Sequence, residues 1–391
     1  MNTQVAITRC EAYEPEAVYT ALALAVDAAP GLDVSGKTVL LKPNIVFDSP
    51  PEKAIATHPV FLEAAIRLVK ERGAARILVG DSPGLQKPNF TAKLSGLGEV
   101  TKRMGAEWVD FTREKADFPC PEGKALKQFS LTAAVREADC VISLPKLKTH
   151  QLMYYTGAMK NLFGLIPSVM KSPMHVRFPS REGFAAMIVD LNIACKPHYA
   201  LMDAIVGMEG PGPGSGDPRH IGLVLASSNL LAMDAAASEI LGYPPLEIPV
   251  SREALSRGIW LNSFSEIEYP LLRPDMLRIP DFKKIPLKKS GSQLTEFLLP
   301  KFIRKFRERL IPRPEIDRSI CRLCGDCTRI CGSKAMKVAG EGPDKRVCID
   351  YNTCIRCYCC HEICPVKAIG IKKVSLGEAV FCKHRILQGN E

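Results

Sequence analysis

The feature that most constrains the fold is a repeated run of cysteines near the C-terminal end. Four cysteines spaced C-x₂-C-x₂-C-x₃-C occupy residues 321–331, and the same spacing returns 33 positions later at residues 354–364. The repeat extends beyond the cysteines, because Ala335 aligns with Ala368. An internal duplication of this kind predicts a small unit with pseudo-two-fold symmetry.

This spacing is typical of [4Fe–4S] ligation. Three thiolates two residues apart can wrap one face of a cubane, and the fourth, three residues further on, reaches the other cluster. We therefore predict two [4Fe–4S] clusters. The first set of ligands is Cys321, Cys324, Cys327 and Cys364, and the second set is Cys354, Cys357, Cys360 and Cys331. Zinc is the alternative, but zinc sites usually take two C-x₂-C pairs from separate loops.

One position departs from the bacterial ferredoxin pattern. Cys331 is followed by Gly332, where that pattern has proline. Glycine lacks the backbone restriction of proline, so we expect a looser turn there, or a turn that another chain approaches. The pattern gives no ligand role to Cys348, Cys359 and Cys382, which we expect to be spare thiols.

The first 250 residues alternate short apolar runs with longer helical patterns. We expect strands at 38–41, 76–79, 140–144, 199–202 and 221–226, and helices at 59–72, 183–195 and 231–241. Apolar strands separated by helices predict an α/β fold, with a mostly parallel sheet that has helices on both faces. A small α+β two-cluster ferredoxin-like domain follows it.

The domain boundaries follow from these patterns. We expect an α/β domain at 1–280, a basic linker with an amphipathic helix at 281–314, the ferredoxin-like domain at 315–375 and a C-terminal tail at 376–391. The net charge is +10, and residues 281–318 contain 11 Lys or Arg against 5 Asp or Glu.

Residues 297–310 form a basic amphipathic pattern. One face carries Phe302, Ile303, Phe306 and Leu310. Such a helix could contact an anionic membrane surface or an acidic partner. A linker helix that packs on its own protein is favoured, because a single helix of this length binds membranes weakly.

Several classes of protein lack their usual signals in this sequence. No run approaches the roughly 18 to 20 apolar residues that cross a bilayer, and the first residues have no signal-peptide pattern. We therefore predict a cytoplasmic protein with no transmembrane segment. No helix-turn-helix, RRM or zinc-finger spacing accompanies the basic charge, which argues against a nucleic-acid partner. The oligomeric state is left open.

Polar residues follow several of the predicted strands. Ligands of parallel α/β sheets bind beyond the carboxyl ends of the strands. Candidate ligand-holding residues are Lys42, Asn44, Ser82, Lys146, Lys148, Lys160 and Asn161, and candidate proton-transfer residues are His58, Asp81, His150 and Asp234. Any one of them could be a helix cap or a solvated charge, but several strand ends together favour a shared cleft.

Two glycine-containing segments lie near these strand ends. Residues 157–164 are expected to pass close to a bound ligand or to be a tight packing point. Residues 207–217 are expected to be a lid over the cleft or a long surface loop.

Four motifs in this order resemble the domain of unknown function 362 family. They are Leu41-Lys-Pro-Asn44, Gly80-Asp-Ser-Pro-Gly84, Leu144-Pro-Lys-Leu-Lys-Thr-His150 and Gly157-Ala-Met-Lys-Asn-Leu-Phe-Gly164. The resemblance covers about residues 5–245, and residues 315–375 resemble a bacterial-type two-cluster ferredoxin domain, a common fusion in that family. The resemblance implies an iron–sulfur protein of bacteria or archaea and does not imply a reaction.

These observations predict an iron–sulfur redox protein. As an oxidoreductase, it would take electrons from a redox partner protein and pass them singly to a small anionic substrate or cofactor at the strand ends. The alternative is a non-catalytic electron-transfer subunit or a maturation or adaptor protein. An enzyme needs the strand-end groups to converge, whereas an adaptor does not.

Overall fold

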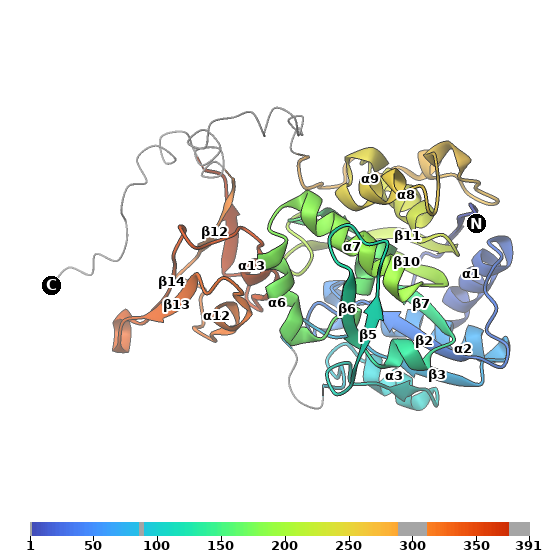
Figure 1. Ribbon diagram of the computed structural model, residues 1–391, viewed down its shortest axis with the longest axis horizontal. Helices are drawn as coiled ribbons and strands as arrows, with labels where there is room; N and C mark the ends of the chain where they lie inside the picture. The colour runs from blue at the N-terminus through green and yellow to red at the C-terminus, as the bar shows by residue number, and fades with distance from the viewer. Residues whose placement is uncertain (1, 86–89, 288–310, 375–391) are drawn as a thin grey trace. The chain divides into compact units, whose positions relative to one another are not determined.

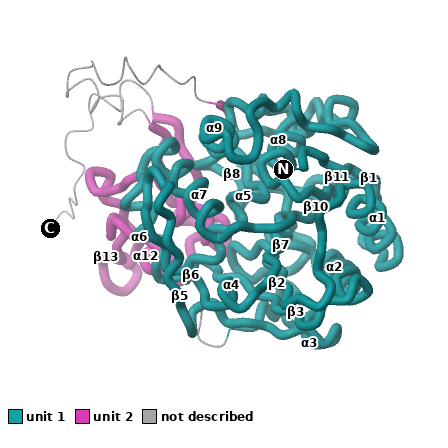
Figure 2. The backbone as a smooth tube through the Cα atoms, turned by 45° about the vertical axis from the view of Figure 1, so that its right-hand side comes forward, with its two compact units in different colours: residues 1–285 teal, residues 286–391 magenta. Residues whose placement is uncertain are grey.

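The computed structural model describes residues 2–85, 90–287 and 311–374. The chain divides into two compact units, Met1–Ile285 and Pro286–Glu391, which Figure 2 shows in different colours.

Unit 1 is built on one large sheet (Figure 1). The strand order is β1-β11-β10-β7-β2-β3-β4, and β8 pairs with β10 and β9. The strands are β1 (Ala6–Arg9), β2 (Thr38–Pro43), β3 (Arg76–Val79), β4 (Glu107–Trp108), β7 (Cys140–Leu144), β8 (Lys146–His150), β9 (Tyr154–Thr156), β10 (Tyr199–Glu209) and β11 (Asp217–Ser227). The pairs from β10 through β7, β2 and β3 to β4 are parallel, as is β10–β8, whereas β1–β11, β10–β11 and β8–β9 are antiparallel. The predicted α/β class with a mostly parallel sheet is confirmed.

Helices cover both faces of this sheet. They are α1 (Pro15–Ala28), α2 (Pro59–Glu71), α3 (Leu97–Arg103), α4 (Ala134–Glu137), α5 (Ala158–Asn161), α6 (Ser168–Arg177), α7 (Arg181–Cys195), α8 (Leu230–Ile240) and α9 (Pro249–Ser256). Val39 and Leu41 of β2 belong to the apolar core that also holds Phe61 and Leu62 of α2. Leu40, between them, is equally buried, and strand alternation turns it to the opposite face. A separate antiparallel hairpin of β5 (Lys115–Pro119) and β6 (Gln128–Thr132) completes the described strands of this unit.

Helix α2 illustrates how the sequence sets the element boundaries. Pro59 occupies its first turn, where a missing N–H costs nothing, and the His58 ring accepts a hydrogen bond from the Val60 N–H at 3.3 Å. The helix ends at Glu71, and Gly73 follows in the left-handed region with φ of 86°. Gly73 therefore allows the chain to leave the helix just after its predicted end at residue 72.

The segment after β7 differs from the prediction. Residues 146–150 lie outside the predicted strands, but they form the buried strand β8. The reason is that β10 continues to Glu209, past the predicted end at 202, and its outer part pairs with Lys146 and Lys148. The glycine-rich segment is the turn between β10 and β11 and is not a long surface loop, because residues 212–216 are buried and a Cβ on Gly212 would lie 2.3 Å from the Thr149 carbonyl oxygen.

Unit 2 repeats its own backbone. Its elements are β12 (Arg313–Ile316), α12 (Asp326–Ile330), β13 (Met336–Ala339), β14 (Arg346–Ile349), α13 (Cys359–Ile363) and β15 (Ile369–Lys372). The starts of β12, α12 and β13 recur 33 residues later in β14, α13 and β15 (313 to 346, 326 to 359, 336 to 369). Strand β12 pairs with β15, and β13 pairs with β14, so each two-stranded sheet takes one strand from each half. The repeat in the sequence is a repeat in the structure.

Backbone conformation follows the same repeat. Residues with positive φ recur at the same offset in the pairs Leu323 and Arg356, Gly325 and Tyr358, and Lys334 and Lys367. The turn after Cys331, closed by the Lys334 N–H at 3.0 Å, matches the turn after Cys364, closed by the Lys367 N–H at 3.2 Å. The same hydrogen bond therefore closes the turn in both halves, although Gly332 stands in one and Pro365 in the other.

Several predictions fall on other parts of the chain. The basic amphipathic helix at 297–310, the tail at 376–391 and Cys382 lie outside the described residues. Among the helices that the structure describes, none has the length and apolar character that crossing a membrane requires.

Candidate functional site

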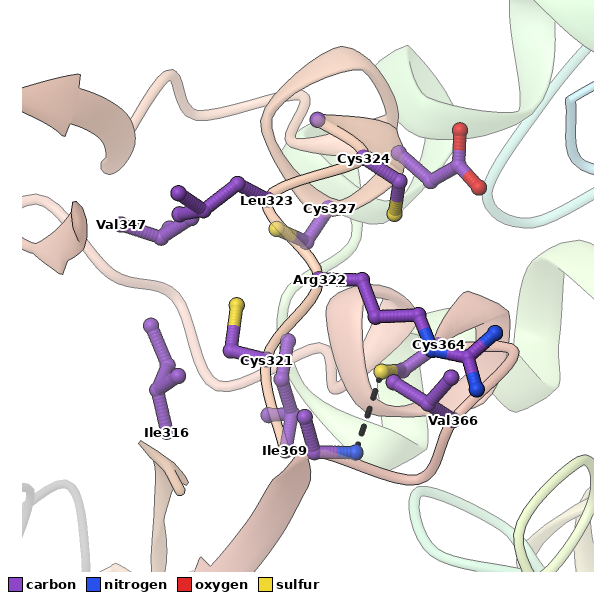
Figure 3. Close-up of a pocket in the computed structure, with 13 residues that line it drawn as sticks. Ile316, Cys321, Arg322, Leu323, Cys324, Cys327, Val347, Cys364, Val366 and Ile369 are labelled. Atoms are coloured by element: carbon purple, nitrogen blue, oxygen red, sulfur yellow. Dashed lines mark hydrogen bonds between the residues drawn. The ribbon is translucent and has the colours of Figure 1, made fainter. Parts of the chain in front are cut away.

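Two regions of the molecule gather reactive side chains, and the first is in unit 2. Cys321, Cys324, Cys327 and Cys364 line one cavity, together with apolar residues that include Ile316 and Val347. Figure 3 shows the four sulfur atoms around this space, with Cys364 coming from the second half of the repeat. The Ala368 N–H donates a hydrogen bond to the Cys364 sulfur at 3.2 Å. Such bonds to ligand sulfurs are one of the ways in which a protein tunes a cluster.

The second cavity has the complementary composition. Its lining includes Cys331, Cys354, Cys357 and Cys360, with Cys359 as a fifth cysteine. The first cavity therefore takes three cysteines of the first half and one of the second, and the second cavity takes four cysteines of the second half and one of the first. Apart from Cys359, the cysteines around each cavity are those of one predicted ligand set. Within residues 2–85, 90–287 and 311–374, no group of three or more His, Cys, Asp or Glu forms a site that could hold a metal ion. The cysteines of unit 2 instead line two cavities.

The second region lies in unit 1, where β2 and β3 end. The Lys42 ammonium is fully buried and lies 2.9 Å from Asp81 Oδ1. Burial lowers the pKa of Lys42, and the neighbouring Asp81 carboxylate opposes that shift. The Asp81 carboxylate also accepts hydrogen bonds from the Ile45 and Ser82 N–H groups, at 2.5 and 2.8 Å.

Asn161 connects this ion pair to its neighbours. Its side-chain oxygen accepts hydrogen bonds from the Lys42 ammonium and from the Asn44 amide, both at 3.0 Å. Its side-chain nitrogen donates to the Lys42 carbonyl and the Ser143 hydroxyl, both at 3.0 Å. The structure thus brings together Lys42, Asn44, Asp81 and Asn161 from three separate motifs.

The glycines of segment 157–164 pack against side chains of the protein itself. A Cβ on Gly164 would lie 2.0 Å from Asp81 Oδ1, and a Cβ on Gly157 would lie 2.0 Å from Asp234 Oδ1. Glycine is needed at both positions because the backbone touches a carboxylate. This geometry favours the packing interpretation of the segment.

Helix α6 adds three residues that the sequence analysis missed. Ser168, Lys171 and His175 are buried, and their spacing places them on one helical face. The Lys171 ammonium donates a hydrogen bond to the Ser82 carbonyl oxygen. Burial lowers the pKa of Lys171 to about 7, with Lys42 and Lys160 lowering it further and Asp81 opposing them. The spacing of the three residues was the available signal.

The remaining basic residues come from β8 and α5. His150 Nδ1 accepts hydrogen bonds from the Leu152 and Met153 N–H groups at 3.1 and 3.3 Å. Burial lowers the pKa of His150 well below its usual range, and the charges of Lys160, His175 and Lys148 add to the effect. We call the following residues the lysine cluster: Lys42, Asp81, Ser82, Lys148, His150, Lys160, Lys171 and His175.

His58 and Lys146 belong to a different network. The Lys146 ammonium lies 2.8 Å from Asp203 Oδ2 and donates to the Tyr13 hydroxyl at 2.6 Å. The Tyr13 hydroxyl in turn donates to Asp203 Oδ1 at 2.8 Å, and the His58 N–H donates to Oδ2 at 2.9 Å. The His58 ring stacks on Tyr13 at 3.5 Å, and burial lowers the pKa of His58 to about 4. His58 is therefore neutral at pH 7.

Asp234 lies in a third environment. Its carboxylate accepts hydrogen bonds from the Ala158 N–H at 2.5 Å, the Met159 N–H at 3.1 Å and the Tyr155 hydroxyl at 3.1 Å. These bonds tie the start of α5 to α8. Burial raises the pKa of Asp234 to about 7, although the three hydrogen bonds lower it.

The lysine cluster contains buried ammonium groups, among them those of Lys42 and Lys171, and two unsatisfied polar atoms. Ser82 Oγ and His175 Nδ1 are buried and have no hydrogen-bond partner among the residues that the structure describes. Buried cations and unpaired polar groups are costly unless a partner satisfies them. The arrangement is suited to a small anion.

The molecule therefore combines an α/β domain, which has a lysine cluster at its strand ends, with a duplicated cysteine unit. The chain belongs to the family described as Domain of unknown function (DUF362), whose model matches residues 39–239. This match lies within unit 1.

A relative and two solved structures extend the comparison. The chain is 30% identical over 288 residues to the Thylakoid-associated protein sll1697 of Synechocystis sp. (strain ATCC 27184 / PCC 6803 / Kazusa), a match that covers 72% of this chain and 88% of the relative. The lactate racemase apoprotein of Thermoanaerobacterium thermosaccharolyticum is 13% identical, with a TM-score of 0.42, 62% of this chain and 57% of that one being covered. A protein from Thermotoga maritima is 11% identical, with a TM-score of 0.32 and coverages of 54% and 55%. The chain thus spans little more than half of each solved structure.

Proposed function

We propose that this protein is an iron–sulfur redox protein whose unit 2 holds two [4Fe–4S] clusters. The observation that carries the proposal is that the eight predicted ligand cysteines line two cavities, four at each, with Cys359 as a fifth cysteine at the second. Thiolate sulfur is the ligand that such clusters prefer, and the mostly apolar lining would limit access of water to them. When bound, the clusters would supply one-electron transfer.

We further propose that the electrons serve an oxidoreductase reaction on an anionic substrate or cofactor in unit 1. The lysine cluster supports this part, because Lys42 pairs with Asp81, the Lys171 ammonium has the same carboxylate nearby, and Lys148 and Lys160 lie near His150. Among the proton-transfer candidates, Asp81 and His150 belong to this cluster, whereas His58 and Asp234 lie in the other two networks. Asp81 and His150 are thus the better placed pair for the proposed reaction.

A non-catalytic electron-transfer subunit or adaptor protein is the second candidate. It is favoured by the pairing of Lys146 with Asp203 and of Asp234 with backbone N–H groups, because these contacts give both predicted site residues a structural use. The relative's name, which describes it as thylakoid-associated, supports peripheral membrane contact as a further possibility for this candidate. The basic segment 281–318 would be the part that contacts the membrane.

The decisive experiment is anaerobic purification of the full chain with quantification of iron, sulfide and zinc. We expect about eight irons and eight sulfides per chain from two cubanes. Two tightly bound zinc ions with little iron would overturn the redox proposal. Native mass spectrometry of the same sample separates the two candidates, because only the enzyme is expected to retain a small anion.

A further inference from the structure

Helix α6 has its polar and apolar faces reversed. A surface helix usually buries an apolar stripe and exposes polar residues. In α6 the buried residues are Ser168, Lys171 and His175, whereas Val169 and Val176 are 74% and 41% exposed. The buried face of this helix is therefore polar, and its polar groups need hydrogen-bond or ion-pair partners.

The charge of Lys171 is not balanced within unit 1. Its ammonium donates to the Ser82 carbonyl oxygen, and no ion pair of Lys171 occurs among the described residues. The nearby Asp81 carboxylate is engaged by Lys42 at 2.9 Å. Removing an ammonium from water without an ion-pair partner is costly, and an anionic ligand would offset that cost.

Two polar atoms beside this ammonium also lack partners. Ser82 is fully buried and His175 is 7% exposed, yet neither Ser82 Oγ nor His175 Nδ1 has a hydrogen-bond partner within the described part of the chain. Ser82 carries the carbonyl that Lys171 contacts, and Lys171 and His175 are one helical turn apart. A hydroxyl, an imidazole and an ammonium thus lie on two segments in contact, the turn after β3 and helix α6.

We infer that Lys171, Ser82 and His175 form the binding site for a small oxyanion, either a carboxylate or a phosphate group. The ammonium and the hydroxyl would donate hydrogen bonds to the anion, and the imidazole would donate one from its unpartnered nitrogen. The inference rests on the anionic-ligand part of the proposed function and is independent of the clusters. The inference places the anion where the segment after β3 contacts α6, and not at the strand ends alone.

Calorimetric titration of the full chain at constant ionic strength tests this inference. The probes are inorganic phosphate and acetate, which separate a phosphate site from a carboxylate site. We expect one of them to saturate at one per chain. Lys171→Met should weaken binding at least tenfold, whereas Arg177→Met, an exposed cation on the same helix, should change it less than twofold.

Thermal unfolding without ligand shows whether Lys171 is merely structural. Replacing an unbalanced buried ammonium by methionine should maintain or raise Tm. A lower Tm with unchanged anion binding would assign Lys171 a structural role and overturn the inference, as would a wild-type chain that binds neither probe. If Lys171→Met does not fold, Ser82→Ala replaces it, with an expected loss in affinity of at least fivefold. Iron is quantified in the same samples, so missing clusters and missing anion binding are distinguished.

Discussion

At the scale of single residues, the Lys42–Asp81 pair shows why the strand ends of this domain are unusual. Lys42 and Asp81 are 0% and 2% exposed, and they lie 2.9 Å apart. Such a pair stabilises the fold little more than an apolar pair of the same shape would, because both charged groups lose their hydration on burial. Removing only one partner is much more costly, since it leaves an unbalanced buried charge.

We therefore expect Asp81→Asn to destabilise unit 1 by about 3–5 kcal/mol. The double variant Lys42→Met/Asp81→Asn should recover a large part of that loss, because it removes the stranded charge as well. Urea unfolding followed by tryptophan fluorescence reports on this unit alone, since the two tryptophans of the chain, Trp108 and Trp260, both lie in it. A double variant no more stable than the single one would show that the hydrogen bonds of Asp81, and not its charge, stabilise the site.

At the scale of secondary-structure elements, Asp234 holds α5 and α8 together. Burial raises its pKa from 3.8 to about 7, so the folded protein binds this proton more tightly than the unfolded chain does. The resulting stability is fully present below about pH 4 and is lost as the pH rises through 7. A difference of about three pKa units corresponds to about 4 kcal/mol at most.

Asp234→Asn removes this titration and keeps one acceptor oxygen. We expect the wild-type free energy of unfolding to fall between pH 5 and pH 8 relative to that of the variant. Urea unfolding at four or five pH values in this range measures the difference. Parallel pH profiles for the two proteins would mean that the carboxylate is ionised throughout, held by its hydrogen bonds to Ala158, Met159 and Tyr155.

The elements also show what the sequence could predict. Strands β3 and β7 have the predicted boundaries, because short apolar runs flanked by polar residues carry their own signal. Strand β10 runs seven residues further than predicted, from 202 to 209, because its outer part is stabilised by pairing with β8 and β11. The local sequence pattern does not predict pairing between strands that are far apart in the chain, so it does not predict where β10 ends.

The candidate site was predictable to a similar degree. Lys42, Asp81 and Asn161 were expected to converge because parallel strands end at one edge of the sheet, and they do. Lys171 and His175 were missed because polar residues on a helix usually face solvent. Only the tertiary contacts of α6 show that its polar face is the buried one.

At the scale of the whole molecule, unit 2 is assembled by exchange between two copies of one motif. Each of its two small sheets pairs a strand of the first half with a strand of the second. Each cavity also takes one cysteine from the opposite half, Cys364 in the first and Cys331 in the second. The two halves are therefore expected to depend on each other for folding and for cluster binding.

Double cysteine variants test this exchange directly. With crossed ligands, Cys321→Ala/Cys364→Ala damages one cluster and should leave about four irons in an intact [4Fe–4S] centre. Cys321→Ala/Cys331→Ala damages both and should leave no intact centre. If each half instead bound its own cluster, the two results would be reversed, because Cys321 and Cys331 would then share one cluster. Iron and sulfide content, with the EPR spectrum of the reduced protein, distinguish the two outcomes without any assay of activity. The comparison is internally controlled, since each variant lacks two thiols and both lack Cys321, so a general loss of stability cannot mimic the expected order.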